Sequence, residues 1–162
     1  MRLKRTADME IKRIASFSAD HDIITPGMYI SRIDGDVVTY DLRTRTPNAG
    51  DYMDDLTIHS VEHMLATFMR NGAIGGEVVY FGPMGCRTGF YLLVRDSVTP
   101  QKVREELITA LLNTEKATEM FGATRKECGN YRELSLDAAK AECARYRGVL
   151  EAKNQKTFTY GE

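Results

Sequence analysis

The sequence predicts a single α+β domain. Two pairs of short strand-like segments are separated by segments with helical periodicity, and segregated strands and helices of this kind are typical of the α+β class. The 162 residues match one ordinary domain, long enough to bury a hydrophobic core without disulfides. We expect the domain to span 16–150, between an N-terminal extension over 1–15, where a short helix is expected, and a polar, loosely held C-terminal tail over 151–162.

The first strand pair is predicted over 28–33 and 37–44. Between the two segments lies Asp34-Gly35-Asp36, and Asp-Gly favours the tight turn of a β-hairpin. Side chains along the second strand alternate, so Asp41 and Arg43 share one side of it. On the sequence alone, Arg43 could also be an ordinary charge on the strand surface, and His21 is equally well interpreted as a capped turn residue.

A helix is predicted over 55–70, because apolar residues recur along it with the i, i+3, i+4 spacing of one helix face. They are Ile58, Val61, Leu65 and Phe68. At about 100° per residue, His59 and His63 stack one turn apart on a roughly opposite face, with Glu62 beside them. Asn71-Gly72 then supplies a C-terminal stop.

The second strand pair is predicted over 77–81 and 90–95. The connection between them, 82–89, contains three glycines and a proline, which permit special backbone conformations. This connection holds Cys86 at its centre, and the adjacent Arg87 is expected to favour the thiolate.

Two more helices are predicted in the C-terminal half. Thr99-Pro100 supplies a cap followed by proline at the first helical position, and the apolar spacing beyond it indicates a long helix that ends near Gly122. A loop over 123–133 carries Cys128. The last helix opens at Ser135, and Cys143 falls on its buried side, where a free cysteine packs as a small hydrophobic residue.

Composition and charge exclude several classes of protein. The formal net charge of −1 gives no electrostatic footprint for nucleic acid or an anionic membrane. No apolar run is long enough to span a bilayer, and residues 1–17 lack the apolar stretch of a signal peptide, so the protein is expected in the cytoplasm. The three cysteines are widely spaced and should be thiols in a reducing compartment, which favours metal binding or catalysis.

The two histidines indicate a metal site, because His59 and His63 at i and i+4 can reach one ion. Cys128 is our candidate for the third ligand, although an ordinary loop cysteine is nearly as good an interpretation of its spacing. Two imidazoles and a thiolate leave a tetrahedral metal one open position, as in catalytic sites, and favour iron, zinc or cobalt. Such a metal can polarise a carbonyl or hydroxyl oxygen of a substrate, which makes the neighbouring carbon easier to deprotonate. Glu62 and Cys86 are the candidate residues that would carry the protons.

Two other functions fit the histidine motif. An inverzincin-type metallopeptidase shares the order His-x-x-Glu-His and needs a downstream glutamate as third ligand, for which Glu133 and Glu142 are candidates. That function leaves Cys86 and Cys128 without a role. A non-catalytic metal- or thiol-sensing module would close the coordination sphere with a fourth protein ligand, and His21 is the remaining histidine.

Five separated segments of the chain carry a resemblance to a known family. They are Ser16-Phe17 with Asp20-His21; Tyr40-Asp41-Leu42-Arg43 with Pro47-Asn48; His59-Ser60-Val61-Glu62-His63 continuing to Phe68-Met69-Arg70-Asn71; Pro83-Met84-Gly85-Cys86-Arg87-Thr88-Gly89-Phe90-Tyr91; and Cys128-Gly129-Asn130-Tyr131. In order and spacing these segments resemble the S-ribosylhomocysteine lyases, the LuxS family. The resemblance extends from about residue 15 to residue 147.

The resemblance implies a mostly antiparallel sheet covered by helices, the LuxS/processing-peptidase-like metallohydrolase fold. It also implies a ferrous enzyme, with zinc or cobalt as substitutes, that cleaves the thioether of S-ribosylhomocysteine. The products would be homocysteine and 4,5-dihydroxy-2,3-pentanedione, the precursor of autoinducer-2. Carried over by position, His59, His63 and Cys128 would hold the metal, and Glu62 and Cys86 would share the proton transfers.

The resemblance further implies that Ser16, His21 and Arg43 contact the substrate, and that the active sites lie at the interface of a homodimer. The chain departs from the family pattern at Tyr80, where many members carry an aspartate six residues before the cysteine. The N-terminus also begins further upstream than is usual in the family. Neither departure touches the implied metal ligands or proton carriers.

Overall fold

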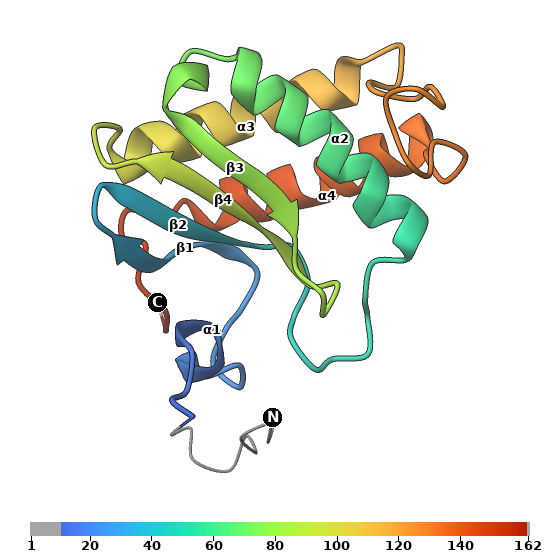
Figure 1. Ribbon diagram of the computed structural model, residues 1–162. Helices are drawn as coiled ribbons and strands as arrows, with labels where there is room; N and C mark the ends of the chain where they lie inside the picture. The colour runs from blue at the N-terminus through green and yellow to red at the C-terminus, as the bar shows by residue number, and fades with distance from the viewer. Residues whose placement is uncertain (1–10, 162) are drawn as a thin grey trace, which may run out of the picture.

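The computed structural model describes residues 11–161 (Figure 1). In chain order the elements are α1 (Ala15–Ser18), β1 (Gly27–Asp34), β2 (Val37–Arg43), α2 (Asp55–Asn71), η2 (Gly75–Glu77), β3 (Val78–Pro83), β4 (Gly89–Arg95), α3 (Pro100–Lys116) and α4 (Leu136–Lys153). The short helix expected within 1–15 lies mostly outside the described residues. The first helix of the structure, α1, begins at Ala15.

The four strands form one antiparallel sheet in the order β1-β2-β4-β3. Each predicted strand pair is a hairpin, and the two hairpins join through β2 and β4, whose register sets Tyr40 opposite Leu92. Gly35 adopts a φ of 59° in the β1–β2 turn, which is the left-handed conformation that an Asp-Gly turn uses. The predicted α+β domain with a mostly antiparallel sheet is therefore confirmed.

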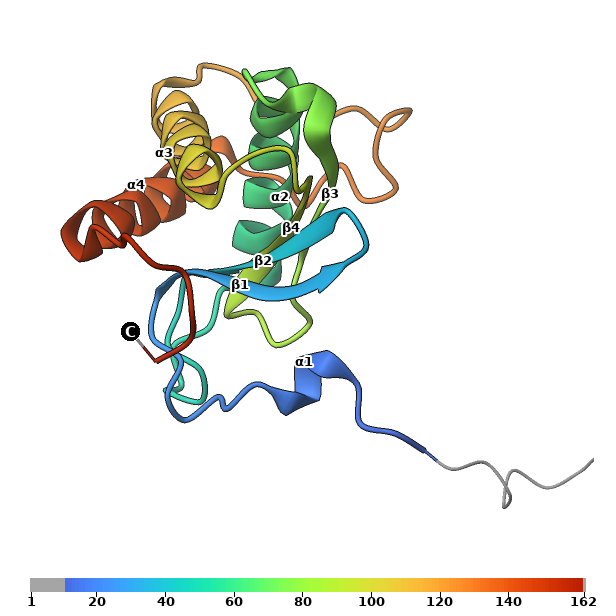
Figure 2. The ribbon, with the colours of Figure 1, turned by 90° about the vertical axis from the view of Figure 1, so that its left-hand side faces the viewer.

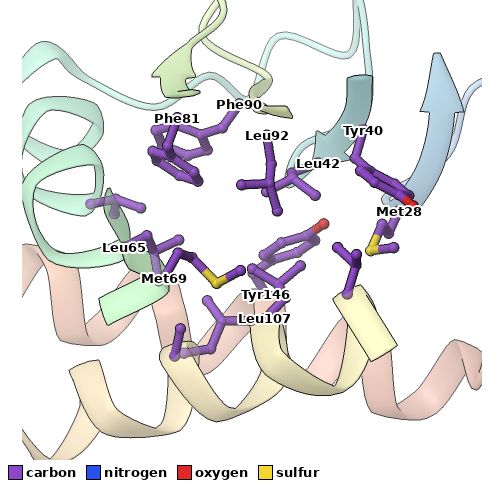
Figure 3. Packing of buried hydrophobic residues seen from close by; sticks show 14 of the residues in the cluster. Met28, Tyr40, Leu42, Leu65, Met69, Phe81, Phe90, Leu92, Leu107 and Tyr146 are labelled. Carbon is purple, nitrogen blue, oxygen red and sulfur yellow. The ribbon is translucent and has the colours of Figure 1, made fainter. Parts of the chain in front are cut away.

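Helices α2, α3 and α4 cover one face of the sheet (Figure 2). The core lies between these two layers (Figure 3). It contains Leu42 and Leu92 from the sheet together with Leu65, Leu107 and Tyr146 from the three helices, all of them buried. Burial of such side chains is the main favourable contribution to folding, and it fixes which face of α2 turns away from the core.

Helix α3 is shorter than the sequence predicts. It begins as expected, with the side chain of Thr99 accepting a hydrogen bond from the Lys102 N–H at 3.2 Å, but it ends at Lys116 and not near Gly122. The apolar residues beyond it still reach the core, since Phe121 packs edge-on against Phe68 of α2 with ring centroids 5.2 Å apart. They do so from a loop, because apolar spacing reports burial and does not by itself specify a helix.

The C-terminal segment is held firmly, so the prediction of a loose tail was wrong. The Gln155 side chain accepts a hydrogen bond from the Met28 N–H and donates one to the Met28 carbonyl, each at 2.9 Å. The Ile30 N–H donates to the carbonyl of Phe158 at 2.7 Å, and the Phe158 side chain is buried. These contacts satisfy backbone groups of β1, an edge strand that has a neighbour on one side only.

The opposite face of the sheet carries no long helix within the described residues. The short helix α1 lies on this side (Figure 2), and Ser16 of α1 lines a cavity of about 310 Å³ together with sheet residues. None of the helices in residues 11–161 combines the length and the hydrophobicity that a membrane span requires.

Candidate metal centre and active site

Helix α2 positions both histidines of the predicted metal site. Asp54 caps the helix by accepting a hydrogen bond from the Thr57 N–H at 2.7 Å, so α2 begins one residue later, as predicted. Buried Ile58, Val61 and Leu65 hold the apolar face against the core. On the other face the imidazole rings of His59 and His63 lie edge-on, with centroids 4.7 Å apart. The i, i+4 geometry expected from the sequence is therefore confirmed.

The loop between α3 and α4 fixes the orientation of both imidazoles. Nδ1 of His59 lies 2.9 Å from the carbonyl oxygen of Glu133, and Nδ1 of His63 lies 2.9 Å from that of Phe121. A carbonyl oxygen can only accept, so each Nδ1 carries the proton and donates. In the neutral ring this tautomer leaves the Nε2 lone pair free, which is the arrangement that a metal-ligating histidine needs.

Gly122 allows the loop to approach His63 closely. Its φ of 64° lies in the left-handed region, where side chains are strained, and a Cβ at this position would stand 2.9 Å from Nδ1 of His63. The glycine follows directly after the carbonyl that orients the ring. Gly122 thus allows the contact that orients His63, whereas the sequence indicated only that a helix ends near this glycine.

Cys128 completes a cluster of three metal-ligating side chains. Its Sγ lies 3.5 Å from Nε2 of His59, and the ligand atoms of Cys128, His59 and His63 all lie within 4.8 Å of one another. Ligands around one tetrahedral ion with bonds of 2.0–2.3 Å stand roughly 3.5 Å apart, so this donor set fits such an ion. The Asn130 N–H also donates to Sγ at 3.4 Å, which suits a thiolate.

The glutamates that a metallopeptidase would need lie outside this cluster. The Glu133 carboxylate accepts a hydrogen bond from the Asn130 side chain at 2.8 Å, and Glu142 pairs with Arg45 and Arg145. His21, the fourth ligand of a sensing module, has its Nδ1 3.0 Å from the carbonyl of Ala19. Within residues 11–161 the cluster contains three ligands, and none of these candidates is among them.

The β3–β4 connection presents Cys86 as an exposed thiol. The next residue, Arg87, has a φ of 62°, and its carbonyl accepts a hydrogen bond at 3.1 Å from the N–H of Met53. Met53 immediately precedes the cap of α2, so the thiol loop is fixed beside the N-terminal end of the histidine helix. The guanidinium of Arg87 lies over the ring of Tyr52, 5.9 Å from its centroid.

Arg43 is linked to Cys86 through the hydroxyl of Thr88, which contacts both side chains. Its side chain is 2% exposed and forms a buried ion pair with Asp41, with Nη2 2.6 Å from Oδ2. Burial opposes the charge, but the hydrogen bonds and charge of Asp41, with smaller contributions from Cys86 and Tyr160, raise the pKa of Arg43. The interpretation of Arg43 as an ordinary surface charge was therefore wrong.

The two remaining predicted residues, Glu62 and Ser16, lie in different parts of the fold. Glu62 lies in α2 between the two histidines and is partly exposed. Ser16 lines the cavity on the outer face of the sheet, together with Arg32, Tyr80 and Tyr91 among others. The residues that line this cavity include none of the three metal ligands. The single chain therefore brings the three candidate metal ligands together but does not place Ser16 with them.

Comparisons with known proteins identify the family of the chain. The family model described as S-ribosylhomocysteinase (LuxS) matches residues 14–157. The chain belongs to the LuxS family. That match covers the residues predicted from the sequence as metal ligands, proton carriers and substrate contacts, and it ends three residues before Tyr160.

Curated relatives match almost the whole chain. An S-ribosylhomocysteine lyase of Finegoldia magna is 40% identical over 159 residues, which cover 94% of this chain and 100% of the relative. One of Borreliella afzelii is 38% identical over 156 residues, with 93% and 99% covered. One of Clostridium acetobutylicum is 36% identical, with 94% and 100% covered. The similarity to LuxS proteins thus extends over the complete length of these relatives or nearly so.

Proposed function

We propose that this protein is an S-ribosylhomocysteine lyase that cleaves the thioether of its substrate to homocysteine and 4,5-dihydroxy-2,3-pentanedione, the autoinducer-2 precursor. One observation carries the proposal: in a chain of the LuxS family, His59, His63 and Cys128 converge with both imidazole Nε2 atoms free to bind a metal. The names of the relatives support the choice of substrate.

The metal is proposed to be ferrous iron, with zinc or cobalt as substitutes, held by His59, His63 and Cys128. Mixed imidazole and thiolate ligands favour these ions over magnesium or calcium. When bound, such an ion acts as a Lewis acid that polarises a carbonyl or hydroxyl oxygen of the sugar. A reducing cytoplasm, where thiols persist, is the proposed location.

Glu62 and Cys86 are the proposed proton carriers. Each would take a proton from a sugar carbon and return it to the neighbouring carbon or oxygen, which moves the carbonyl along the ribose in two steps. Removal of one further proton then expels the homocysteine thiolate by β-elimination. Glu62 is partly exposed and Cys86 is exposed, so both side chains can meet a substrate.

Ser16, His21 and Arg43 are proposed to contact the substrate in a homodimer whose active sites lie at the interface. The open face of the sheet supports this arrangement, because Phe17 of α1 is 71% exposed and Tyr80 of β3 is 52% exposed. Ser16 and His21 lie outside the metal cluster of their own chain. A second subunit is therefore proposed to bring these residues to that cluster.

The direct test is turnover by the ferrous-loaded protein without oxygen, with a chromogenic thiol reagent that reports free homocysteine. We expect thiol release from S-ribosylhomocysteine and no release after the metal has been removed with a chelator. A fully metallated protein that releases no thiol would overturn the proposal.

A further inference from the structure

A continuous chain of hydrogen bonds joins Cys86 to the C-terminal segment. Sγ of Cys86 lies 3.0 Å from Oγ1 of Thr88, and Nη1 of Arg43 donates to the same Oγ1 at 2.8 Å. Nε of Arg43 donates to Oδ1 of Asp41 at 3.0 Å. The hydroxyl of Tyr160 lies 2.7 Å from Oδ2 of Asp41. Four contacts thus connect residues from β2, the β3–β4 connection and the segment after α4.

The chemistry of the groups sets the direction of the bonds that Arg43 makes, whereas in the Cys86–Thr88 contact either atom can be the donor. Arginine has donors only, so the hydroxyl oxygen of Thr88 accepts from Arg43 and keeps its own hydrogen. That hydrogen can be donated to Sγ of Cys86, and a thiolate accepts such a bond well. The side chain of Thr88 has little freedom to rotate, because Thr88 is 2% exposed and its hydroxyl accepts a hydrogen bond from Nη1 of Arg43.

The far end of the chain is anchored by Tyr160. A carboxylate can only accept, so the Tyr160 hydroxyl donates to Asp41. The Tyr160 ring also stacks on Tyr29 of β1, with centroids 5.1 Å apart, and the segment before it is held to β1 through Gln155 and Phe158. Asp41 therefore accepts hydrogen bonds on both oxygens, which leaves its carboxylate little freedom to rotate.

We infer that Thr88 is a positioning residue that donates a hydrogen bond to the Cys86 thiolate, and that Tyr160 keeps Thr88 in place through the buried Asp41–Arg43 pair. The catalytic use of this thiol rests on the proposed function above, whereas the hydrogen-bonded chain stands on geometry alone. Tyr160 lies three residues beyond the part of the chain that the family model matches.

The first test replaces the donor. Thr88→Val keeps the shape of the side chain but removes its hydroxyl, and Thr88→Ser keeps the hydroxyl. Alkylation of Cys86 by iodoacetamide at pH 7, followed by mass spectrometry of the Cys86 peptide, reports the thiolate without any substrate. We expect a rate about threefold to tenfold lower in Thr88→Val and near the wild-type rate in Thr88→Ser, because a hydrogen bond to a charged group is lost in the first only.

The matched control is Thr114→Val. Thr114 is also a fully buried threonine beside a cysteine, in its case Cys143 in the core. Its substitution removes a hydroxyl of the same kind but should leave the alkylation rate of Cys86 unchanged. In the turnover assay, Thr88→Val should lower kcat, because the hydroxyl beside the Cys86 sulfur is lost.

The second test asks whether Tyr160 acts through Thr88. Tyr160→Phe removes a single oxygen atom from a partly buried residue near the C-terminus. This variant therefore keeps the inference testable if the more buried Thr88→Val does not fold. We expect about a twofold lower alkylation rate in Tyr160→Phe, no change in the exposed neighbour Thr159→Ala, and no further loss when Tyr160→Phe is added to Thr88→Val.

Two results would overturn the inference: a wild-type alkylation rate in folded Thr88→Val, or effects of the two substitutions that simply add. If Tyr160→Phe alone is available, a wild-type rate in that variant overturns the role of the anchor. A wild-type protein that releases no homocysteine would overturn the proposed function and still leave the alkylation result in force.

Discussion

The sulfur of Cys128 lies 3.5 Å from Nε2 of His59, although 69 residues separate the two in the sequence. The contact depends on the loop between α3 and α4, which supplies Cys128 and also the Glu133 carbonyl that orients the His59 ring. One loop thus provides one candidate metal ligand and the carbonyl that orients another. Metal affinity should therefore be sensitive to the conformation of this loop as well as to the ligands themselves.

Gly122→Ala is the sharpest test of that sensitivity. The new Cβ would stand 2.9 Å from Nδ1 of His63, at a φ of 64° that disfavours side chains, so the ring or the loop must move. We expect metal affinity to fall roughly 10- to 100-fold, the usual effect of disturbing an outer contact of a ligand. Competition with a chromogenic chelator measures this. Gly148→Ala, where an added Cβ meets nothing within 4 Å, is the control and should leave metal affinity unchanged.

The buried C-terminal segment should contribute measurably to stability. Phe158→Ala removes a side chain that is 7% exposed and packed in the core cluster, and we expect the free energy of unfolding to fall by about 3 kcal/mol. Urea denaturation monitored by circular dichroism measures the loss. Exposed Thr157→Ala should change the same free energy by less than about 0.5 kcal/mol. Equal effects of the two substitutions would mean that the segment is not packed as described.

Glu142 should make stability depend on acidity. Burial alone would raise the pKa of this carboxyl, but its hydrogen bonds and charge interactions with Arg45 and Arg145 outweigh burial and lower it. Its contribution is thus fully present above the ordinary pKa of 4.5 and is lost as pH falls through the lower folded value.

We therefore expect Glu142→Gln to reduce the free energy of unfolding by about 2 kcal/mol at pH 7, because the carboxyl is 5% exposed and its two partners lose their charge pair. Urea denaturation of both proteins across the acidic range should show the difference shrinking as pH falls. A difference that grows toward acid would contradict the assigned ion pairs.

A heterodimer can test the shared active site. If His21 serves the metal cluster of the partner subunit, a purified heterodimer of Cys128→Ala and His21→Ala chains contains one intact site and should show roughly half of wild-type turnover. Each homodimer alone should be inactive. A heterodimer of Cys128→Ala and His59→Ala chains is the control and should also be inactive, because both residues belong to one chain's cluster. An inactive first heterodimer would place His21 in its own chain's site.

Much of this architecture was predictable, because local patterns dictate it. The Asp34-Gly35 turn specifies the first hairpin, and the apolar stripe of α2 determines which way His59 and His63 face. Cys128 was less predictable. From spacing alone, an ordinary loop cysteine was nearly as good an interpretation as a third metal ligand, and only the family resemblance favoured the ligand. The structure then placed it in the cluster.

Other parts of the site carry no signal in a single sequence. The carbonyls of Phe121 and Glu133 orient the histidines, but every residue has a backbone carbonyl, so nothing in the sequence marks these two. The anchoring role of Tyr160 could not be predicted, because most residues around it are polar. The only available signal was two aromatic residues, Phe158 and Tyr160, near the end of a segment that was expected to be loose.

In the proposed reaction Cys128 holds the metal and Cys86 transfers protons. The most direct test measures metal content by mass spectrometry and homocysteine release in the same preparations of Cys128→Ala and Cys86→Ala. We predict that Cys128→Ala loses both metal and turnover, whereas Cys86→Ala keeps its metal and loses turnover. Wild-type metal content together with full turnover in both variants would contradict the account.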